Sequence, residues 1–392
     1  MIHYLKYTLF HLLLVPGVVG FTLGGHWLGL GLLFAILLVV GGDLILGDDK
    51  STPKMEQTWL LNLQLYSALP VMFLLYFLIL WSVAEGDPLG YGAWIESITG
   101  YVALAARETN SAFDYIVALF TTILFTGVVG TIVAHELTHR TWDPISLLIG
   151  RWLLAFSYDV GFSIEHVYGH HVYVSCENDP ATAPRGRNVY THIVVSTIEG
   201  NVSAHRLEKT RLERLGLSVW SLQNRFLRGL LMSAALVVVS YAIAGLMGVL
   251  FFSISALGAK ALLEIVNYME HYGMVRNPAT PVQPRHSWNS NKKISSWATF
   301  NLTRHSHHHA QGDLPFWNLK PYEGAPMMIN GYLTTVFLTL VPPLWHKLMV
   351  PKLLEWDAHY ADEEERVLAA EANRKSGLVG LMDYNGYDAV KA

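Results

Sequence analysis

Residues 113–140 read FDYIVALFTTILFTGVVGTIVAHELTHR. The apolar run over 113–134 contains a single charged residue, Asp114, and a helix needs about 20 apolar residues to cross a bilayer. The stretch therefore predicts a membrane-spanning helix that ends directly at a pair of histidines, His135 and His139. Because these two residues are four positions apart, they share one face of the helix.

Other apolar runs are also long enough to cross a membrane. We expect six spans, at about residues 7–24, 27–46, 65–84, 113–134, 229–248 and 251–270. Tight turns at Gly24-Gly25-His26 and near Gly248 would join two pairs of spans as hairpins. Of the 392 residues, 52% are hydrophobic and 15% charged, whereas a soluble domain has roughly 25% charged residues. The sequence thus predicts an all-α integral membrane protein with about six transmembrane helices.

The basic residues favour one orientation. With a cytoplasmic N-terminus, Arg107 is the one basic residue in the predicted outside loops, and Lys260 falls within a span, as the positive-inside rule expects. Residues 135–228 and 271–356 then form a cytoplasmic helical cap, in which the weaker apolar stretches 144–163 and 332–350 are interfacial helices. We expect one membrane-embedded catalytic domain over 1–356 and a polar tail or linker over 357–392.

Three more histidine clusters lie on the same predicted side as His135 and His139. They read EHVYGHH at 165–171, EHYG at 270–273 and RHSHHH at 304–309. Imidazole is a common ligand of redox metals. One ion takes about four to six ligands, so a set this large implies two metals. In so apolar a chain, the pattern suggests a metal centre that oxidises a lipid-soluble compound.

Spacing indicates how the clusters are used. His166 and His170 repeat the spacing of four residues, and so do His305 and His309, whereas His307 is out of helical phase and is expected to be supporting or solvent-facing. A ligating histidine usually donates its other N–H to a carboxylate or carbonyl. The candidate carboxylates are Glu136, Glu165, Asp179, Glu264 and Glu270. An acid within a span is costly, which favours Glu264; the others could equally be surface carboxylates.

Two other classes of protein would use part of this pattern. The stretch HELTH contains the zinc-protease signature His-Glu-x-x-His, in which Glu136 would be the general base, but one zinc leaves most of the histidines unused. A metal carrier would need ligands along the spans, whereas these histidines converge at one depth. Because Cys176 is the only cysteine, disulfides within the chain and cysteine-held iron–sulfur sites are excluded. The net charge of −4 gives no indication of nucleic-acid binding.

The clusters resemble the motifs of the membrane alkane monooxygenases, the AlkB-type alkane 1-monooxygenases. The resemblance is carried by HELTHR (135–140), EHVYGHH (165–171), NYMEHYG (267–273) and LTRHSHHHA (302–310), with HSWNSN (286–291) and NGYLTTVFLTLVPPLW (330–345). The third motif is the most specific, since fatty-acid desaturases share the histidine boxes only loosely. Arg140, Thr303 and His307 stand where the family has Lys, Gln and Asp.

The resemblance implies a non-haem di-iron centre, without directly bound haem, flavin or nucleotide. The implied iron ligands are His135, His139, His166, His170, His171, His271, His305, His308 and His309. It also implies terminal hydroxylation of medium-chain n-alkanes to 1-alkanols with O2, the first step of alkane degradation. Two electrons would come from rubredoxin, itself reduced by an NAD(P)H-dependent reductase. The implied location is the bacterial inner membrane, with both termini and the iron site cytoplasmic. A fatty-acid desaturase or an alkyl-aromatic monooxygenase is the alternative.

An alkane has no polar group, so its binding must come from apolar burial, roughly 0.8 kcal/mol per CH2. We expect a slot between the second, third, fourth and sixth spans that admits the chain from lipid. Gly127 and Gly130 would leave room for it, and Val129 and Ile36 would limit its length; ordinary helix packing is the alternative. The candidate dock for an acidic rubredoxin comprises Arg140, Arg185, Arg187, Arg304, Lys292 and Lys293.

Overall fold

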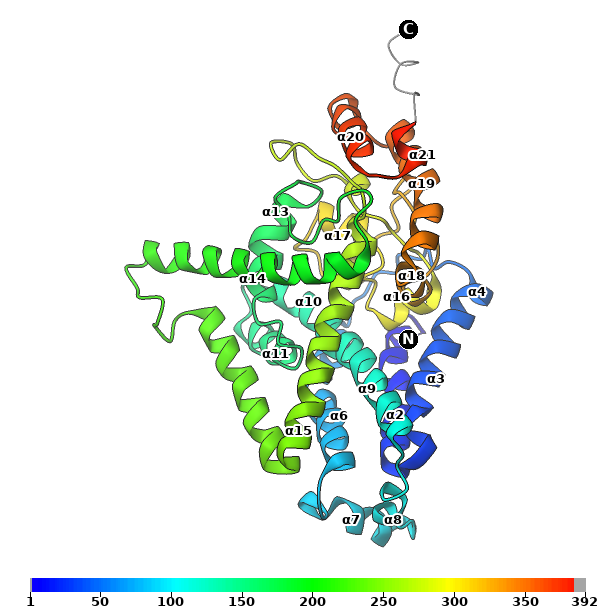
Figure 1. Cartoon of the computed structure of the whole chain (residues 1–392), viewed down its shortest axis with the longest axis vertical. Coiled ribbons are helices and arrows are strands. Elements are labelled where there is room, and N and C mark those ends of the chain that lie inside the picture. Colours follow the sequence, from blue (N-terminus) through cyan, green and yellow to red (C-terminus); the bar gives the residue numbers. More distant parts are fainter. Residues whose placement is uncertain (1, 384–392) are drawn as a thin grey trace.

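A computed structural model describes residues 2–383 as a bundle of long helices below a layer of shorter ones (Figure 1). These residues form no β-strand, only the isolated bridges Asp48–Lys292 and Asn289–Met327. The helices of the bundle are α1 Ile2–Leu5, α2 Leu9–Leu23, α3 Leu30–Ile36, α4 Gly42–Leu46, α5 Thr58–Tyr66, α6 Ala68–Val83, α9 Ala112–Phe125, α10 Val133–His139 and α15 Arg225–His271. The fold is therefore all-α, as predicted.

The remaining helices lie at the two ends of the bundle. At the end opposite the histidines are α7 Tyr91–Thr99 and α8 Ala103–Arg107 (Figure 1). The cap consists of α11 Pro144–Ala155, α12 Phe162–Glu165, α13 His171–Tyr173, α14 Val189–Arg214, α16 Lys293–Ala298, α17 His305–Ala310, α18 Tyr332–Thr339, α19 Pro342–His359, α20 Glu363–Lys375 and α21 Val379–Met382. Short 3-10 turns are η1 Lys6–Thr8, η2 Gly25–Gly29, η4 Pro88–Gly90, η7 Pro284–His286 and η8 Phe316–Asn318.

Five helical segments are long and apolar enough to span a membrane. They are His3–Leu23, Gly25–Leu46, Thr58–Val83, Ala112–His139 and Arg225–His271. The last has 47 residues and is broken at Ala244 and Gly245, where Gly245 has a φ of 57°, a conformation that glycine adopts readily. Its two limbs form a V in Figure 1. With this break, the five segments give six apolar limbs among residues 2–383. The turn lies at 244–245, three residues before the predicted position near Gly248.

The two weaker apolar stretches do not form straight spans. Helix α11 has 12 residues, about 18 Å at 1.5 Å per residue, which is too short to cross. Helices α18 and α19 are bent by 118° relative to each other. Helix α14 lies across the ends of the long helices (Figure 1). The cap therefore covers one end of the bundle with helices that run mostly across it.

Three wide π-turns interrupt helices close to the histidines. They are η3 Leu37–Gly41 between α3 and α4, η5 Thr126–Ile132 between α9 and α10, and η6 His166–His170 between α12 and α13. A π-turn inserts one extra residue, which shifts the phase of every following side chain. These turns change which residues face the interior of the bundle.

The tail folds back onto the cap as far as the structure describes it. Asp362 and Glu365 cap α20 reciprocally, and Arg285 pairs with both, at 2.8 Å in each case. His286 Nε2 lies 2.6 Å from Glu365. The end of the predicted flexible tail, residues 384–392, lies outside the described residues. The division into a domain over 1–356 and a tail over 357–392 remains a prediction.

Candidate metal centre

Nine histidines from four separate segments converge into two groups beneath the cap. Within each group, one ring nitrogen per residue lies within 4.8 Å of all the others. The first group is His135, His139, His166, His171 and His308, and the second is His170, His271, His305 and His309. The groups together contain all nine predicted ligands and leave out the other histidines.

The nitrogens are spaced as ligands of a common ion. In the second group, Nε2 of His305 lies 3.1 Å from Nε2 of His271 and 3.0 Å from Nε2 of His309. In the first, Nε2 of His171 lies 3.2 Å from that of His166 and 3.1 Å from that of His308. Nitrogens bound at about 2.1 Å to one ion, at right angles to each other, would lie about 3 Å apart. Both groups therefore fit a metal ion.

Unpaired buried nitrogens support this fit. Nε2 of His135, His139 and His170 are buried without a hydrogen-bond partner, although buried polar atoms are normally satisfied. Burial lowers the pKa of His166, His171 and His308 well below its ordinary value, and neighbouring histidines lower it further. These rings are therefore neutral, the form that binds metals.

The wide turn η6 divides its three histidines between the groups. His166 and His171 are five residues apart and share the first group, while His170 faces the second. The four-residue spacing of His166 and His170 left open whether one turn directs its histidines to one metal or to both. The structure divides them between the two groups, because a π-turn has more residues per turn.

Asp179 holds His170 in place. Its Oδ2 lies 2.9 Å from His170 Nδ1 and also accepts a hydrogen bond from Thr182. Burial disfavours the charged imidazole, but Asp179 raises the pKa of His170 above its ordinary value. With Nδ1–H directed to Asp179, the other nitrogen of His170 is left to face the second group.

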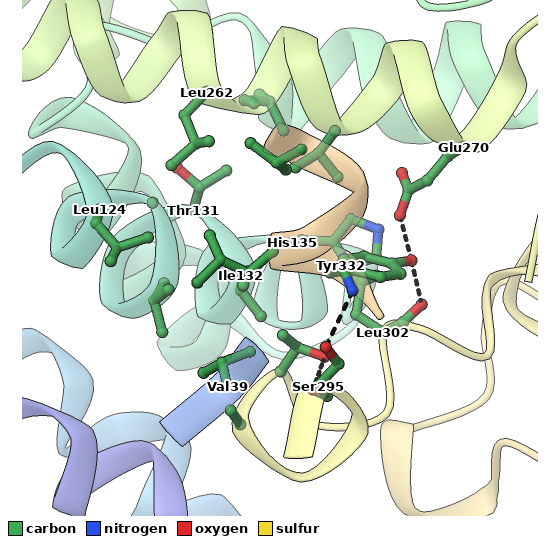
Figure 2. Close-up of a pocket in the computed structure, with 18 of the residues that line it drawn as sticks. Val39, Leu124, Thr131, Ile132, His135, Leu262, Glu270, Ser295, Leu302 and Tyr332 are labelled. Atoms are coloured by element: carbon green, nitrogen blue, oxygen red, sulfur yellow. Dashed lines mark hydrogen bonds between the residues drawn. The ribbon is translucent and has the colours of Figure 1, made fainter. Parts of the chain in front are cut away.

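Glu270 borders the second group. One carboxylate oxygen lies 3.2 Å from Nε2 of His305, the nitrogen that faces His271 and His309. The other accepts a hydrogen bond of 2.5 Å from the Tyr332 hydroxyl (Figure 2). Sequence reasoning did not single out Tyr332, although it lies within the quoted stretch 330–345.

The other predicted acids lie elsewhere. Glu136 accepts a hydrogen bond from Arg140 at 2.7 Å, which occupies the group that a zinc protease would use as its base. Glu264 pairs with Lys260 at 2.5 Å and does not belong to either histidine group. Glu165 lies 3.4 Å from the Ser203 hydroxyl, and burial raises its pKa to about 8.

The remaining histidines have separate roles. His307 is buried, not solvent-facing, and its Nδ1 accepts a hydrogen bond of 2.8 Å from the Lys320 amide. Its ring packs against Tyr322, on the side of α17 away from both groups. His192, His205, His286 and His346 also lie outside the two groups.

An apolar cavity leads from the long helices to the histidines (Figure 2). Its inner end is lined by His135 and His166 of the first group and His305 of the second. The walls come from the first, second and fourth spans and the last limb of α15, with α16 and α18 closing one side. The third span, which was predicted to contribute, supplies none of the lining residues described here.

Only some of the predicted channel residues line this cavity. Gly127 lines the cavity, and the nearby wall positions are Ala35, Val39, Val128 and Thr131. Val129 is fully buried in the hydrophobic core, and neither Ile36 nor Gly130 lines the cavity. The lining positions Leu124, Val128, Thr131 and His135 recur every three to four residues, the spacing of one helix face, and Val129 falls outside this series.

Half of the predicted rubredoxin dock is buried. Arg140 and Arg185 pair with Glu136 and Asp357, and Arg304 donates to the carbonyls of Leu319 and Asp49. These three guanidinium groups therefore hold the cap together. Arg187, Lys292 and Lys293 are partly exposed and remain candidates.

Known proteins are similar to this chain in sequence. The fatty acid desaturase family matches residues 112–328, which include all four histidine segments. Alkane 1-monooxygenase of Acinetobacter baylyi is 31% identical over 352 residues, 88% of this chain and 81% of that enzyme. This chain belongs to the membrane alkane monooxygenase family. It is thus an integral membrane protein of an oxidoreductase family, and its two histidine groups fit metal ions.

Two further proteins are similar to this chain. Alkane 1-monooxygenase 1 of Pseudomonas aeruginosa is 40% identical over 253 residues, which is 63% of this chain and 65%, just under two thirds, of that enzyme. The hydroxylase component of xylene/toluene monooxygenase from Pseudomonas putida is 32% identical over 377 residues, 95% of each chain. The family therefore includes proteins named for alkanes and for alkylated aromatics.

Proposed function

We propose that this chain is an alkane 1-monooxygenase that inserts one oxygen atom of O2 into the terminal C–H bond of medium-chain n-alkanes. The observation that carries the proposal is the apolar cavity whose inner end is lined by His135, His166 and His305. A molecule without polar groups can bind there by apolar burial alone. Its terminal carbon would reach both histidine groups first.

We further propose that each histidine group holds one iron ion, which supplies the redox chemistry for O2 activation when bound. Neutral imidazoles add no negative charge to the site. Asp179 orients His170 of the second group through Nδ1, and Glu270 lies beside the Nε2 of His305 that faces the group. The aliphatic walls formed by Val39, Leu124 and Leu262 (Figure 2) exclude water and position the substrate.

Electrons would enter from the cap, for which we propose rubredoxin, reduced by an NAD(P)H-dependent reductase. The N-terminus and the histidine groups lie at one end of the bundle, and the turn at Gly24 packs against α8 at the other (Figure 1). Combined with the distribution of basic residues, this supports a cytoplasmic cap and termini, and the bacterial inner membrane as the location.

Hydroxylation of a methyl group on an alkylbenzene is the second candidate. It is favoured by the match to the xylene/toluene enzyme component over 95% of both chains. An aromatic ring is wider than an extended alkane, so the same cavity would need more room near its inner end.

One assay under 18O2 distinguishes these activities. Purified, iron-loaded protein with reduced rubredoxin would receive n-alkanes of several lengths, toluene and a saturated fatty acyl chain. We expect 18O-labelled 1-alkanols as the main products. Mainly labelled benzyl alcohol would favour the second candidate, and an alkene would assign a desaturase. An alcohol without label would refute oxygen insertion from O2.

A further inference from the structure

A second, polar cavity approaches the histidines from the side of α14. Its mouth is formed by Pro180, Gly200 and Asn201, which are partly exposed, and its inner end by His166 and His170. The cavity volume is about 20 Å³, enough for about one water molecule. Helix α14, which carries Gly200 and Asn201, lies across the ends of the spans (Figure 1).

The cavity is lined by an ionic cluster formed by the last limb of α15 and Asp159, which lies between α11 and α12. The Lys260 ammonium lies 2.9 Å from Asp159 and 2.5 Å from Glu264. The two carboxylates are 3% exposed. Charges in a spanning helix are costly and usually functional. A lysine with a single carboxylate would suffice for charge balance, whereas here two carboxylates face one ammonium group.

Hydrogen bonds continue from this cluster toward the metal groups. The carboxylate of Glu264 accepts from the Ser196 hydroxyl at 2.5 Å and from the Asn267 amide at 3.1 Å. Asn267 lines both the polar and the apolar cavity. It therefore stands between Glu264 and the space beside His135 and His166.

We propose that this cluster is a proton-delivery path, in which Lys260 and Glu264 relay protons from the mouth at Gly200 and Asn201 to the metal groups. The inference rests on the proposed function. Converting an alkane, O2, two electrons and two protons to an alcohol and water breaks one C–H and the O–O bond, and forms one C–O bond. The electrons come from the carrier protein, and the protons must come from water. The aliphatic walls of the substrate cavity offer no continuous route for them.

The first test measures water access without any turnover. In a Cys176→Ala background, the single thiol of Ser196→Cys would be followed in the metal-free protein by the infrared shift from S–H to S–D after transfer to D2O, which requires access for one water molecule only. Ser233→Cys is the matched control, because Ser233 is similarly buried on the first limb of α15. We expect the thiol of Ser196→Cys to exchange many times faster than that of the control. Equal, slow exchange of both would overturn the proposal.

The second test distinguishes a role of Glu264 in proton relay from a purely structural role. Glu264→Gln keeps Lys260 paired with Asp159, and we expect about a 100-fold slower product formation, a larger solvent isotope effect and diversion of electrons to hydrogen peroxide. Iron content and alkane affinity should not change. Glu264→Asp should restore part of the rate, and Ser196→Ala should lose part of it. Glu208→Gln, on α14 but outside the cavity and paired with Arg211, should behave as wild type.

Wild-type rate and isotope effect in both Glu264→Gln and Ser196→Ala would refute the relay. If Glu264→Gln loses iron, the test rests on Ser196→Ala alone, because that variant keeps both ion pairs of Lys260. If the unaltered protein oxidises no hydrocarbon, the proposed function fails, whereas the exchange experiment still shows whether water enters the cavity.

Discussion

At the residue scale, the contact between Asp179 and His170 orients one ring of an otherwise all-histidine group. A neutral imidazole has two tautomers, and only the one with its proton on Nδ1 leaves Nε2 free for a metal. Asp179 selects this tautomer at 2.9 Å. Among residues 2–383, no carboxylate makes an equivalent contact with a histidine of the first group, so the two histidine groups are chemically different.

Asp179→Asn should therefore weaken the second metal position selectively. We expect a 10- to 100-fold loss of affinity for one ion and about one bound iron per chain at limiting iron. Metal analysis after dialysis measures this directly. Glu136→Gln is the control, because Glu136 pairs with Arg140 and should retain both ions. Equal iron content in the two variants would contradict the assigned role.

Val128 is the residue that should limit substrate length. It lines the cavity seven residues before His135, about 10 Å along the helix. In Val128→Trp, each methylene excluded from the cavity should cost about 0.8 kcal/mol, or about fourfold in kcat/KM. Competition among alkanes, followed by product analysis, should show a shift to shorter chains. Phe120→Trp, at an exposed position of α9, serves as the control. If Val128→Trp and Phe120→Trp gave the same product profile, Val128 would not lie on the substrate path.

At the scale of elements, the wide turn η6 decides how its histidines reach the centre. His166 of η6 and His171 at the start of α13 share one group, and His170 belongs to the other. In η5, Val128 and Thr131 lie on the cavity wall and Val129 in the core. These wall positions and His135 recur every three to four residues, the spacing of one helix face.

Helix α20 is an element held by charge. Glu365 contacts Arg285 and His286 at 2.8 Å and 2.6 Å. Although burial opposes ionisation, these partners lower the pKa of Glu365 to about 2. Its stabilising contribution is therefore fully present above pH of about 4.3 and is lost as the pH falls toward 2.

Glu365→Gln should loosen α20 at neutral pH by about 2 kcal/mol, the typical contribution of hydrogen bonds to charged groups. Hydrogen exchange of residues 363–375 should become faster, while the long helices of the bundle exchange as before. Glu371→Gln changes an exposed pair with Lys375 and should leave exchange unaltered. Unchanged exchange in Glu365→Gln would mean that apolar contacts alone hold the helix.

At the scale of the whole molecule, the metal groups lie where the bundle meets the cap. The histidines come from α10, η6, α13, the end of α15 and α17, so bound metal would tie together segments that are far apart in sequence. Two cavities of opposite character meet there, the apolar one from the spans and the polar one from α14.

Removing the metals should therefore destabilise the entire assembly. A ligand present at 100 to 1,000 times its Kd stabilises the folded state by about 3 to 4 kcal/mol, and chelation should remove this contribution for each ion. The thermal transition of the chelated protein should fall and recover when iron is returned. His307→Ala should keep the metal-dependent part of the shift, since His307 lies outside both groups. A thermal transition temperature that does not change on chelation would argue against a stabilising role of the metals.

The amino-acid sequence was enough to predict the all-α membrane architecture, about six apolar limbs and the nine histidines that gather into two groups. Hydrophobic length and charge act locally, and imidazole chemistry is a property of the residue type, so both can be recognised without a fold. The tertiary structure alone decided which histidines share a group, which carboxylates touch them and which residues line the cavity. These outcomes depend on π-turns, on the packing of α14 against α15 and on side-chain pairs such as Lys260 with Glu264, which no local pattern specifies.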